Sequence, residues 1–236
     1  MSYNYFLRSM NSFIGGIINT SKRFYVRLDN IRRIANYLRT HDIKKLHLGA
    51  GSNILEGWCN TDINPDIKTG IFLDASKKFP FADCVFDYIF SEHMIEHLEF
   101  RKGINMLKEC FRVLKPGGKL RVSTPNLQYL IELYNPKKTE IQRREIIRIV
   151  NMVFPDIKIY EDVFVINNFF RNWGHKFIYD YKLFKELMEK NGFVNVVQCD
   201  VKKSNDENFR NIEAHGKFIS EEINKLQTFI VEGAKI

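Results

Sequence analysis

The stretch Lys44–Asn53, KKLHLGAGSN, decides the fold. Residues 45–48 predict a short buried strand, which Gly49–Gly51 ends abruptly. A Gly-x-Gly turn directly after a strand lets a ligand approach backbone N–H groups that no Cβ shields. The stretch therefore predicts a nucleotide-type binding turn, although Asn53 stands where a dinucleotide fingerprint has its third glycine. Such glycines are also ordinary turn residues, so the neighbouring segments have to show whether this turn binds a nucleotide.

Acidic residues end the next two apolar runs. Asp62 closes the run that begins at Cys59, and Asp74 follows residues 71–73. Only ten residues separate Gly51 from Asp62, too few for a crossover helix and a second strand, so this first connection must be short or degenerate. A carboxylate at a strand end can accept hydrogen bonds from ribose hydroxyls, which predicts nucleoside recognition by Asp62; the alternative is a turn residue before a proline.

The rest of the chain alternates predicted strands and helices. Residues 85–91 predict a buried parallel strand, and 101–115 predict a helix that Pro116-Gly117-Gly118 ends. Residues 127–172 form an insertion after the fifth strand, where it can cap a pocket at the sheet edge. Further predicted elements are the strands 119–123, 193–200 and 226–234 and the helices 28–40, 127–134, 140–154 and 180–190.

Composition favours one α/β domain in a reducing compartment. The chain has 236 residues, of which 44% are apolar and 27% are charged, as in ordinary globular proteins. The four cysteines at 59, 84, 110 and 199 are scattered, without a CxxC pair or a Cys/His cluster at metal-ligand spacing. We therefore expect neither a disulfide framework nor a zinc site, and a cytoplasmic location.

Positive charge is concentrated near the N-terminus. The net charge is +8, which is consistent either with an anionic partner or with simple solubility. Residues 1–43 predict a basic helical arm, which could contact a membrane surface or a polyanion; we favour a helix packed on the domain with a solvated basic face. We expect neither a transmembrane helix, since no run of about 18 apolar residues exists, nor a signal peptide.

Five segments in series carry a resemblance to a known family. They are LHLGAGSN, NTDIN, LDAS, FPFADCVFDYIFSEHMIEHL and LKECFRVLKPGGKLRVSTPN, within residues 44–126. The series resembles the class I S-adenosylmethionine-dependent methyltransferases, especially the small ones associated with surface-polysaccharide biosynthesis; residues 174–235 match more loosely. The resemblance implies a Rossmann-like α/β fold whose seven-stranded, mostly parallel sheet has an antiparallel edge hairpin and flanking helices. The methyltransferase domain would span 44–236 and include the capping insertion 127–172.

The resemblance implies S-adenosylmethionine as the cofactor. The residues implied to bind it follow four strands: Gly49, Ala50, Gly51, Asp62, Ile63, Asp74, Ala75, Ser91 and Glu92. The glycine turn would line its amino-acid part, Asp62 its ribose and Asp74 with Ala75 its adenine, while Ser91 and Glu92 would lie under the sulfonium. The family usually has an acid where this chain has His47.

Three histidines are candidates for the acceptor side of the site. Methyl transfer from a sulfonium requires the protein mainly to align the nucleophile and to exclude water. A hydroxyl nucleophile is helped by a nearby base, usually histidine, and the candidates are His175, His93 and His215. Each could instead be a loop histidine tied to the backbone. Arg171 and Arg210 are predicted to grip a phosphate or carboxylate on the acceptor.

One motif suggests a different chemistry. His93, Glu96 and His97 fit H-x-x-E-H, the pattern of the inverted zinc proteases. Because the motif follows a parallel strand inside the methyltransferase series, we reject a metalloprotease, expect no metal and predict a structural role for His97.

We predict a methyltransferase that acts on a small acceptor, a sugar hydroxyl in glycan or polysaccharide biosynthesis. The sugar rests on the family association alone. An RNA methyltransferase is the alternative that the positive charge favours, although the chain lacks an Asn/Asp-Pro-Pro-aromatic motif. A second alternative is a non-catalytic binding subunit, which the departures from the family pattern at His47 and Asn53 suggest. An NAD oxidoreductase is disfavoured because the full glycine fingerprint is lacking. The sequence leaves the oligomeric state open.

Overall fold

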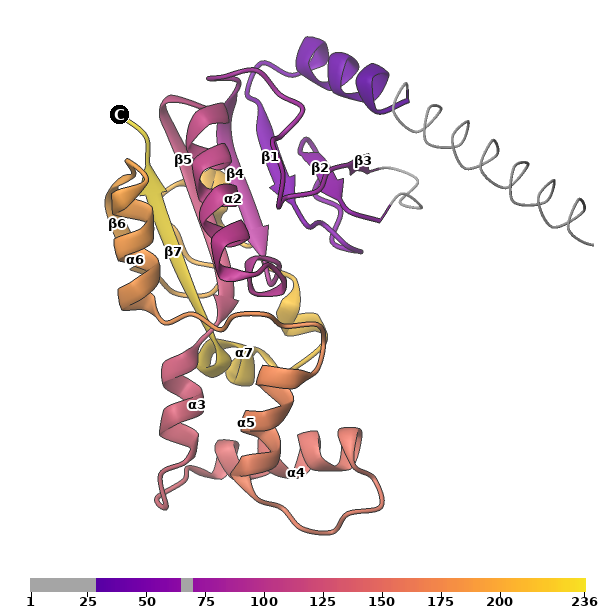
Figure 1. Ribbon diagram of the computed structural model, residues 1–236, viewed down its shortest axis with the longest axis vertical. Coiled ribbons are helices and arrows are strands. Elements are labelled where there is room, and N and C mark those ends of the chain that lie inside the picture. The colour runs from indigo at the N-terminus through magenta and orange to yellow at the C-terminus, as the bar shows by residue number, and fades with distance from the viewer. Residues whose placement is uncertain (1–28, 65–69) are drawn as a thin grey trace, which may run out of the picture.

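The computed structural model describes residues 29–64 and 70–236 (Figure 1). The strands are β1 Lys45–Leu48, β2 Cys59–Asp62, β3 Ile71–Phe72, β4 Phe86–Glu92, β5 Leu114–Pro125, β6 Val194–Cys199 and β7 Thr228–Ala234. The helices are residues 29–40, α2 Phe100–Val113, α3 Leu127–Leu133, α4 Glu140–Val153, α5 Asp162–Arg171, α6 Tyr181–Lys190 and α7 Glu221–Gln227, with the 3-10 turns η1 Ile95–His97, η2 Glu207–Phe209 and η3 His215–Lys217. Most of the basic arm, residues 1–28, lies outside the described residues.

The strands form one seven-stranded sheet in the order β3-β2-β1-β4-β5-β7-β6. Strands β1 to β5 pair in parallel, whereas β7 runs antiparallel to both β5 and β6. The predicted Rossmann-like fold, with a mostly parallel sheet and an antiparallel edge, is confirmed. The carboxyl ends of the parallel strands point toward α3, α5 and α7 (Figure 1).

The boundary between α2 and β5 differs from the prediction. The helix ends at Val113, and β5 begins at once at Leu114 instead of at Lys119. The pairing of β4 with β5 shifts between Phe86 and Tyr88, so Pro116-Gly117-Gly118 forms a bulge inside the strand. Gly117 has a φ of 81°, which suits the bulge. The prediction also missed α5, which has no side-chain N-cap, and the short helix α7, although Ser220 caps it.

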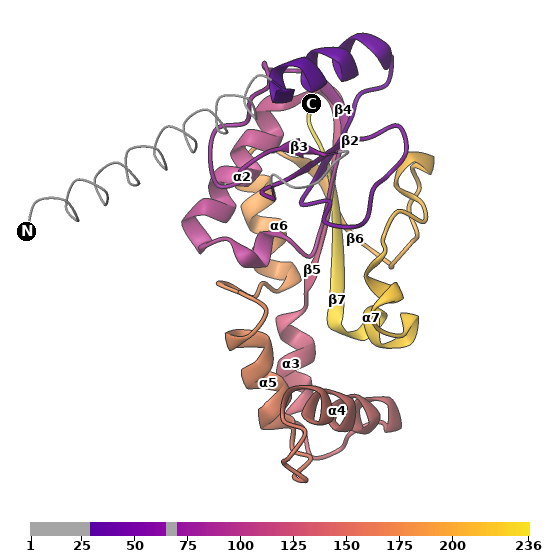
Figure 2. The same cartoon turned by 90° about the vertical axis from the view of Figure 1, so that its right-hand side faces the viewer.

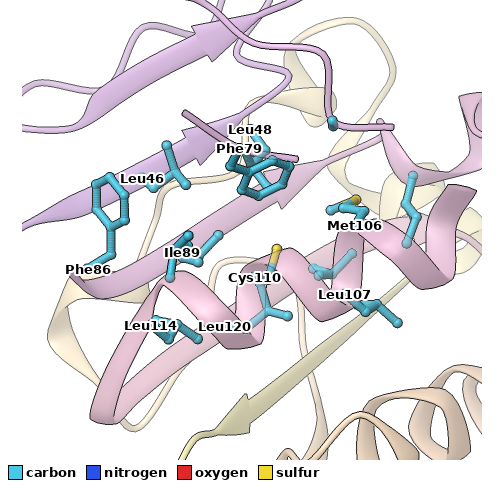
Figure 3. Packing of buried hydrophobic residues seen from close by; sticks show 14 of the residues in the cluster. Leu46, Leu48, Phe79, Phe86, Ile89, Met106, Leu107, Cys110, Leu114 and Leu120 are labelled. Carbon is cyan, nitrogen blue, oxygen red and sulfur yellow. The ribbon is translucent and has the colours of Figure 1, made fainter. Parts of the chain in front are cut away.

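One face of the sheet carries the main hydrophobic core. Helices α2 and α6 lie together on this side (Figure 2), and residues 29–40 contribute Ile34 and Tyr37 to the same core. Figure 3 shows Leu46 and Leu48 of β1 packed with residues of β4, α2 and β5. Because side chains alternate along a strand, His47 between them points to the opposite face.

The opposite face is covered by irregular segments. Residues 49–58 join β1 to β2 through turns without a helix, which confirms the short first connection. Trp58 packs there with Phe90 of β4 and with Phe209 from the segment between β6 and α7. Arg121 of β5, with no exposed surface, anchors this segment: it pairs with Glu213 at 2.6 Å and donates to the carbonyl oxygens of Lys203 and Asp200.

The insertion has a hydrophobic core of its own. Residues of α3, α4 and α5 form a separate buried cluster, which lies beyond the carboxyl ends of the strands (Figure 1). It is joined to the sheet domain through a buried hydrogen bond of 2.7 Å from Gln227 Nε2 to Glu145 Oε1. None of the described helices is both long and apolar enough to cross a membrane.

Candidate active site at the carboxyl ends of the strands

The two glycines of the opening turn have different surroundings. Both adopt left-handed backbone, with φ values of 68° at Gly49 and 50° at Gly51. A Cβ on Gly49 would collide with the side chain of Met94. At Gly51, by contrast, no described atom lies within 4 Å of the position that a Cβ would take. Packing therefore requires the first glycine, whereas the second borders open space that a ligand can enter.

Asp62 connects the turn to the end of β2. Its Oδ2 accepts a hydrogen bond of 2.9 Å from the backbone N of Gly51, and its Oδ1 accepts one of 2.8 Å from Asn64 N. Each carboxylate oxygen has a second lone pair. The carboxylate thus holds the turn in place and still has acceptor capacity for hydroxyl groups.

Asp74 lies after the neighbouring strand β3. Its carboxylate accepts hydrogen bonds from the backbone N and Oγ of Ser76, at 3.0 and 2.6 Å, and pairs with Lys77. Burial alone would raise the pKa of Asp74, but the interactions with Ser76 and Lys77 outweigh it and lower that pKa. Ala75 is buried beside it, whereas the apolar side chain of Ile63 is exposed at this edge of the sheet.

The predicted residues at the end of β4 have unequal roles. Ser91 is fully buried, and its Oγ has no hydrogen-bond partner in the part of the chain that the structure describes. The Glu92 carboxylate accepts hydrogen bonds from the backbone N of Ala214 at 2.9 Å and of His215 at 3.0 Å. Burial raises the pKa of Glu92. Glu92 therefore ties the segment around residue 214 to the sheet edge.

Two further polar residues, His47 and Asn53, make hydrogen bonds next to the glycine turn. His47 is buried against Trp58 and Phe90, and its Nδ1 lies 3.1 Å from Oδ1 of Asn60. Burial lowers the pKa of His47 to about 4, so its ring is neutral near pH 7. Asn53, in the position of the missing glycine, donates a hydrogen bond of 3.1 Å to the carbonyl oxygen of Ile212.

Next to this edge, a cavity of about 280 Å³ lies between the sheet domain and the insertion. All three candidate histidines line it, together with His97, and this convergence could not be read from their sequence positions. The residues that line it are His93, Glu96, His97, Pro125, Arg148, Ile149, Met152, Phe169, Trp173, His175, His215, Phe218, Ile219 and Gln227.

His93 is held by the protein on both sides of its ring. Its Nδ1 lies 3.3 Å from Oε1 of Glu96, and its Nε2 lies 3.0 Å from Oγ1 of Thr228. The ring of His215 stacks on it with centroids 3.8 Å apart. Since one ring nitrogen is hydrogen-bonded to Thr228 and the other faces Glu96, His93 is better suited to position its neighbours than to contact an acceptor.

His175 is placed by a tight turn. Residues Trp173 and Gly174 both have positive φ, and His175 N donates to the carbonyl oxygen of Asn172, as in a type I′ turn. Its ring Nδ1 lies 2.7 Å from the carbonyl oxygen of Phe169. This contact requires the proton on Nδ1, so a neutral ring presents the Nε2 lone pair to the cavity.

His215 presents its ring without a hydrogen-bonding partner. Its backbone is fixed by Glu92, but its ring nitrogens make no hydrogen bond within the described residues. Burial and the nearby His93 ring lower the pKa of His215 to about 3, which keeps the ring neutral. A neutral ring of this kind accepts a hydrogen bond from a hydroxyl group.

Sequence reasoning missed two charged residues of the cavity, and it proposed two arginines, Arg171 and Arg210, that do not line it. Glu96 is completely buried, which its place in the polar-looking run HMIEHL does not reveal. Arg148 lines the cavity and pairs with Glu145 at 2.6 Å. Arg210 does not line it; its guanidinium donates to the carbonyl oxygens of residues 204 and 205 on the surface.

Comparison with known proteins agrees with this arrangement. Residues 60–122, which run from β2 into β5, match a family model described as a methyltransferase domain. No curated protein has a matching sequence. The family match supports an S-adenosylmethionine-dependent methyltransferase with S-adenosylmethionine as its cofactor.

Several solved structures are similar to this chain at low sequence identity. A possible exported protein from Bordetella parapertussis has a TM-score of 0.50 at 11% identity, covering 89% of this chain and 67% of that one. An S-adenosylmethionine-dependent methyltransferase from Archaeoglobus fulgidus has a TM-score of 0.49 at 20% identity, covering 89% and 94%. Phosphoethanolamine N-methyltransferase 2 from Haemonchus contortus has a TM-score of 0.45 at 13% identity. The match covers 88% of this chain and 52% of the Haemonchus protein, so the chain spans about half of that protein's length.

The residues at the sheet edge fit this cofactor. Open space at Gly51, spare acceptor capacity on Asp62 and the unpartnered Ser91 hydroxyl offer room and polar contacts for a nucleoside joined to an amino acid. The exposed side chain of Ile63 adds an apolar contact at the same edge. All these groups lie at or just after the carboxyl ends of β1, β2 and β4.

Proposed function

We propose that the protein transfers the methyl group of S-adenosylmethionine to a hydroxyl of a small acceptor, a sugar in glycan or polysaccharide biosynthesis. The observation that carries this proposal is the cavity of four histidines next to the cofactor edge. Its volume of about 280 Å³ is just below the range of about 300–1,000 Å³ that is usual for small-molecule sites. That size suits a single sugar ring better than a nucleic acid strand.

The glycine turn, Asp62, Asp74 with Ala75, and Ser91 are proposed to hold the cofactor. Gly51 lets its amino-acid part approach the backbone, and Asp62 accepts hydrogen bonds from its ribose. When bound, S-adenosylmethionine supplies an electrophilic methyl group. Glu92 contributes indirectly in this proposal, because its carboxylate fixes the backbone of His215 beside the acceptor cavity.

The histidines are proposed to orient the acceptor. Nε2 of His175 and the free ring of His215 offer lone pairs that can accept a hydrogen bond from the reacting hydroxyl. His93 positions His215 through ring stacking. The apolar lining from Ile149, Met152 and Phe169 limits access of water.

A pair of glycine variants tests the cofactor site. Gly51→Ala and Gly57→Ala replace glycines with φ values of 50° and 73°, and no described atom lies within 4 Å of either new Cβ. Their stabilities should therefore fall equally. Only Gly51→Ala should weaken binding of S-adenosylhomocysteine, by about tenfold or more, as measured by calorimetry. Equal affinities in the two variants, or no binding by the parent protein, would contradict the proposed site.

The acceptor class is tested by turnover with defined compounds. Formation of S-adenosylhomocysteine should depend on a sugar from a panel of free and nucleotide-linked monosaccharides. His175→Ala should lower turnover at least tenfold with little change in cofactor affinity, whereas His41→Ala, outside the cavity, should leave both unchanged. Methylation of RNA with no activity on any sugar would overturn the sugar assignment and leave the cofactor site intact.

A further inference from the structure

Three metal-ligating side chains meet in the wall of the cavity. A carboxylate oxygen of Glu96 and one ring nitrogen each of His97 and His175 all lie within 4.8 Å of one another. The first two residues come from η1, and the third comes from the turn that follows α5. The reaction proposed above does not use Glu96 or His97.

The Glu96 carboxylate lacks a full set of partners. It has no exposed surface, and its Oε2 accepts a hydrogen bond of 3.0 Å from Thr124 Oγ1. Its Oε1 has no hydrogen-bond partner within the described residues; His93 Nδ1 lies 3.3 Å away, without hydrogen-bond geometry. A buried carboxylate oxygen without a donor is costly, and a bound cation would satisfy it.

The two histidines are arranged as metal ligands require. His175 donates its Nδ1 proton to the carbonyl oxygen of Phe169 at 2.7 Å, which leaves the Nε2 lone pair free. Metal-binding histidines commonly donate their other ring N–H to a backbone carbonyl in this way. The His97 ring is exposed and makes no hydrogen bond in the part of the chain that is described; its centroid is 5.0 Å from that of His175.

The backbone holds the two segments together without help from a ligand. The carbonyl oxygen of Glu96 accepts hydrogen bonds from the backbone N of Lys176 at 2.7 Å and of Phe177 at 3.2 Å. These contacts, with the tight turn before His175, fix the two segments that carry the three ligands. Only side-chain rotation is left for closing the site.

We propose that Glu96, His97 and His175 bind one divalent transition-metal ion, with Zn²⁺ as the best match. Two imidazoles and one carboxylate form a donor set typical of such ions, and of zinc sites that keep a position open. Ligand atoms about 2.1 Å from a tetrahedral Zn²⁺ are about 3.4 Å apart, so the side chains have to close by about an ångström. All three residues line the cavity, so the open position faces it.

This arrangement differs from the ligand set of the H-x-x-E-H pattern. In that pattern the two histidines bind the metal, but here both ring nitrogens of His93 face other protein groups. The second histidine is supplied by a distant part of the chain, which is why sequence spacing did not indicate it. If the proposed methyl transfer is correct, the ion would occupy the Nε2 lone pair of His175 and would itself coordinate the acceptor hydroxyl, in place of a direct hydrogen bond from that hydroxyl to His175, and make it more acidic; this role alone rests on the proposed function.

The site is tested by metal titration of the full-length chain after removal of bound metal with a chelator. Co²⁺ should bind with a stoichiometry of one, seen as visible d–d absorption, and one equivalent of Zn²⁺ should displace it. His97→Ala, His175→Ala and Glu96→Gln should each weaken Zn²⁺ binding at least 100-fold in calorimetry. His41→Ala is the control, because His41 lies outside the cavity and should not change the affinity.

Two measurements distinguish a loss of metal binding from a loss of folding and from a loss of the transferase reaction. His97 is exposed, so its variant should keep the parent melting temperature and its affinity for S-adenosylhomocysteine. No saturable Zn²⁺ binding by the parent chain would overturn the proposal, even if cofactor binding is normal. Binding that survives in both histidine variants, or that is lost on Cys84→Ser at the exposed cysteine instead, would also overturn it.

Discussion

At the scale of single residues, His47 shows how a departure from the family pattern is accommodated. Its ring is buried between the sheet and Trp58, and it contacts Asn60 instead of the cofactor edge. Asn60 in turn bonds to both the N and O of Leu55, so it fixes the turn that follows β1. Through Asn60, His47 thus supports the glycine turn as a neutral hydrogen-bonding group.

This burial predicts a pH dependence of stability. The pKa of His47 falls from 6.5 in the unfolded chain to about 4 in the folded one. Between these values the unfolded state binds more protons, so stability is lost as the pH falls from 6.5 toward 4, by up to about 3 kcal/mol. Urea denaturation at several pH values should show a shallower acid dependence for His47→Gln than for the parent.

The control for this experiment is His41→Gln, which removes a histidine outside the core and should keep the parent profile. The free energy of unfolding of His47→Gln should still fall somewhat with falling pH, because the lowered pKa of His215, about 3, acts in the same direction. Identical profiles for His47→Gln and the parent would show that His47 is not buried in its neutral form.

Gly49 supports a second prediction at this scale. Ala at this position has to adopt a φ of 68° and also collides with Met94. Gly57→Ala has the same left-handed strain without a collision and should cost about 1–2 kcal/mol. Gly49→Ala should lower the free energy of unfolding by a further ~1–3 kcal/mol because of overpacking. In urea denaturation, this extra loss should largely disappear when Gly49→Ala is made in a chain that already carries Met94→Ala. Equal costs for the two alanine variants would rule out the collision.

At the scale of elements, an irregular segment covers the sheet face opposite α2 and α6. Residues 200–213 stay there because Arg121 binds two of their backbone carbonyl oxygens and the Glu213 carboxylate. Glu232 of β7 contacts the same guanidinium. The buried guanidinium of Arg121, between two carboxylates, therefore holds this irregular segment on the sheet face.

Removing this arginine should be costly. Arg121→Met leaves the buried Glu213 carboxylate without its cation, which predicts a loss of about 3–5 kcal/mol in the free energy of unfolding. Lys119→Met is the matched control on the same strand, since Lys119 pairs with Asp206 at the surface and should cost under about 1 kcal/mol. Similar losses for both variants in urea denaturation would contradict the anchoring role of Arg121.

At the scale of the whole molecule, the insertion and the sheet domain enclose the cavity between them. Glu145 of α4 has almost no exposed surface; it joins the two parts through Gln227 of α7, and it also pairs with Arg148 of its own helix. Glu145→Ala should increase hydrogen exchange of α3 to α5 and raise the acceptor KM, while the cofactor Kd stays constant. Arg144→Ala breaks only an exposed 3.7 Å contact to Glu222 and should change nothing measurable. Unchanged exchange in the insertion after Glu145→Ala would contradict this coupling.

Sequence reasoning predicted the sheet well, but it did not predict the contacts between distant segments around the cavity. The strand ends at Leu48 and Asp62 and the capped helix after Asp180 follow from local signals, because periodicity and turn chemistry act over a few residues. The burial of Glu96 and its approach to His175 depend on how distant segments pack, which no local pattern records. The same applies to Arg121, whose partners come from two other segments, residues 200–213 and β7.

The short segment from Ile212 to His215 touches both halves of the proposed site. Its first carbonyl oxygen accepts from Asn53 on the glycine turn, and its last two backbone N–H groups are bound by Glu92. A ligand that shifts this segment from one side changes the affinity on the other side, and by reciprocity the second ligand changes the first by the same factor. In the proposed site, the affinities for donor and acceptor would then be coupled through these four residues.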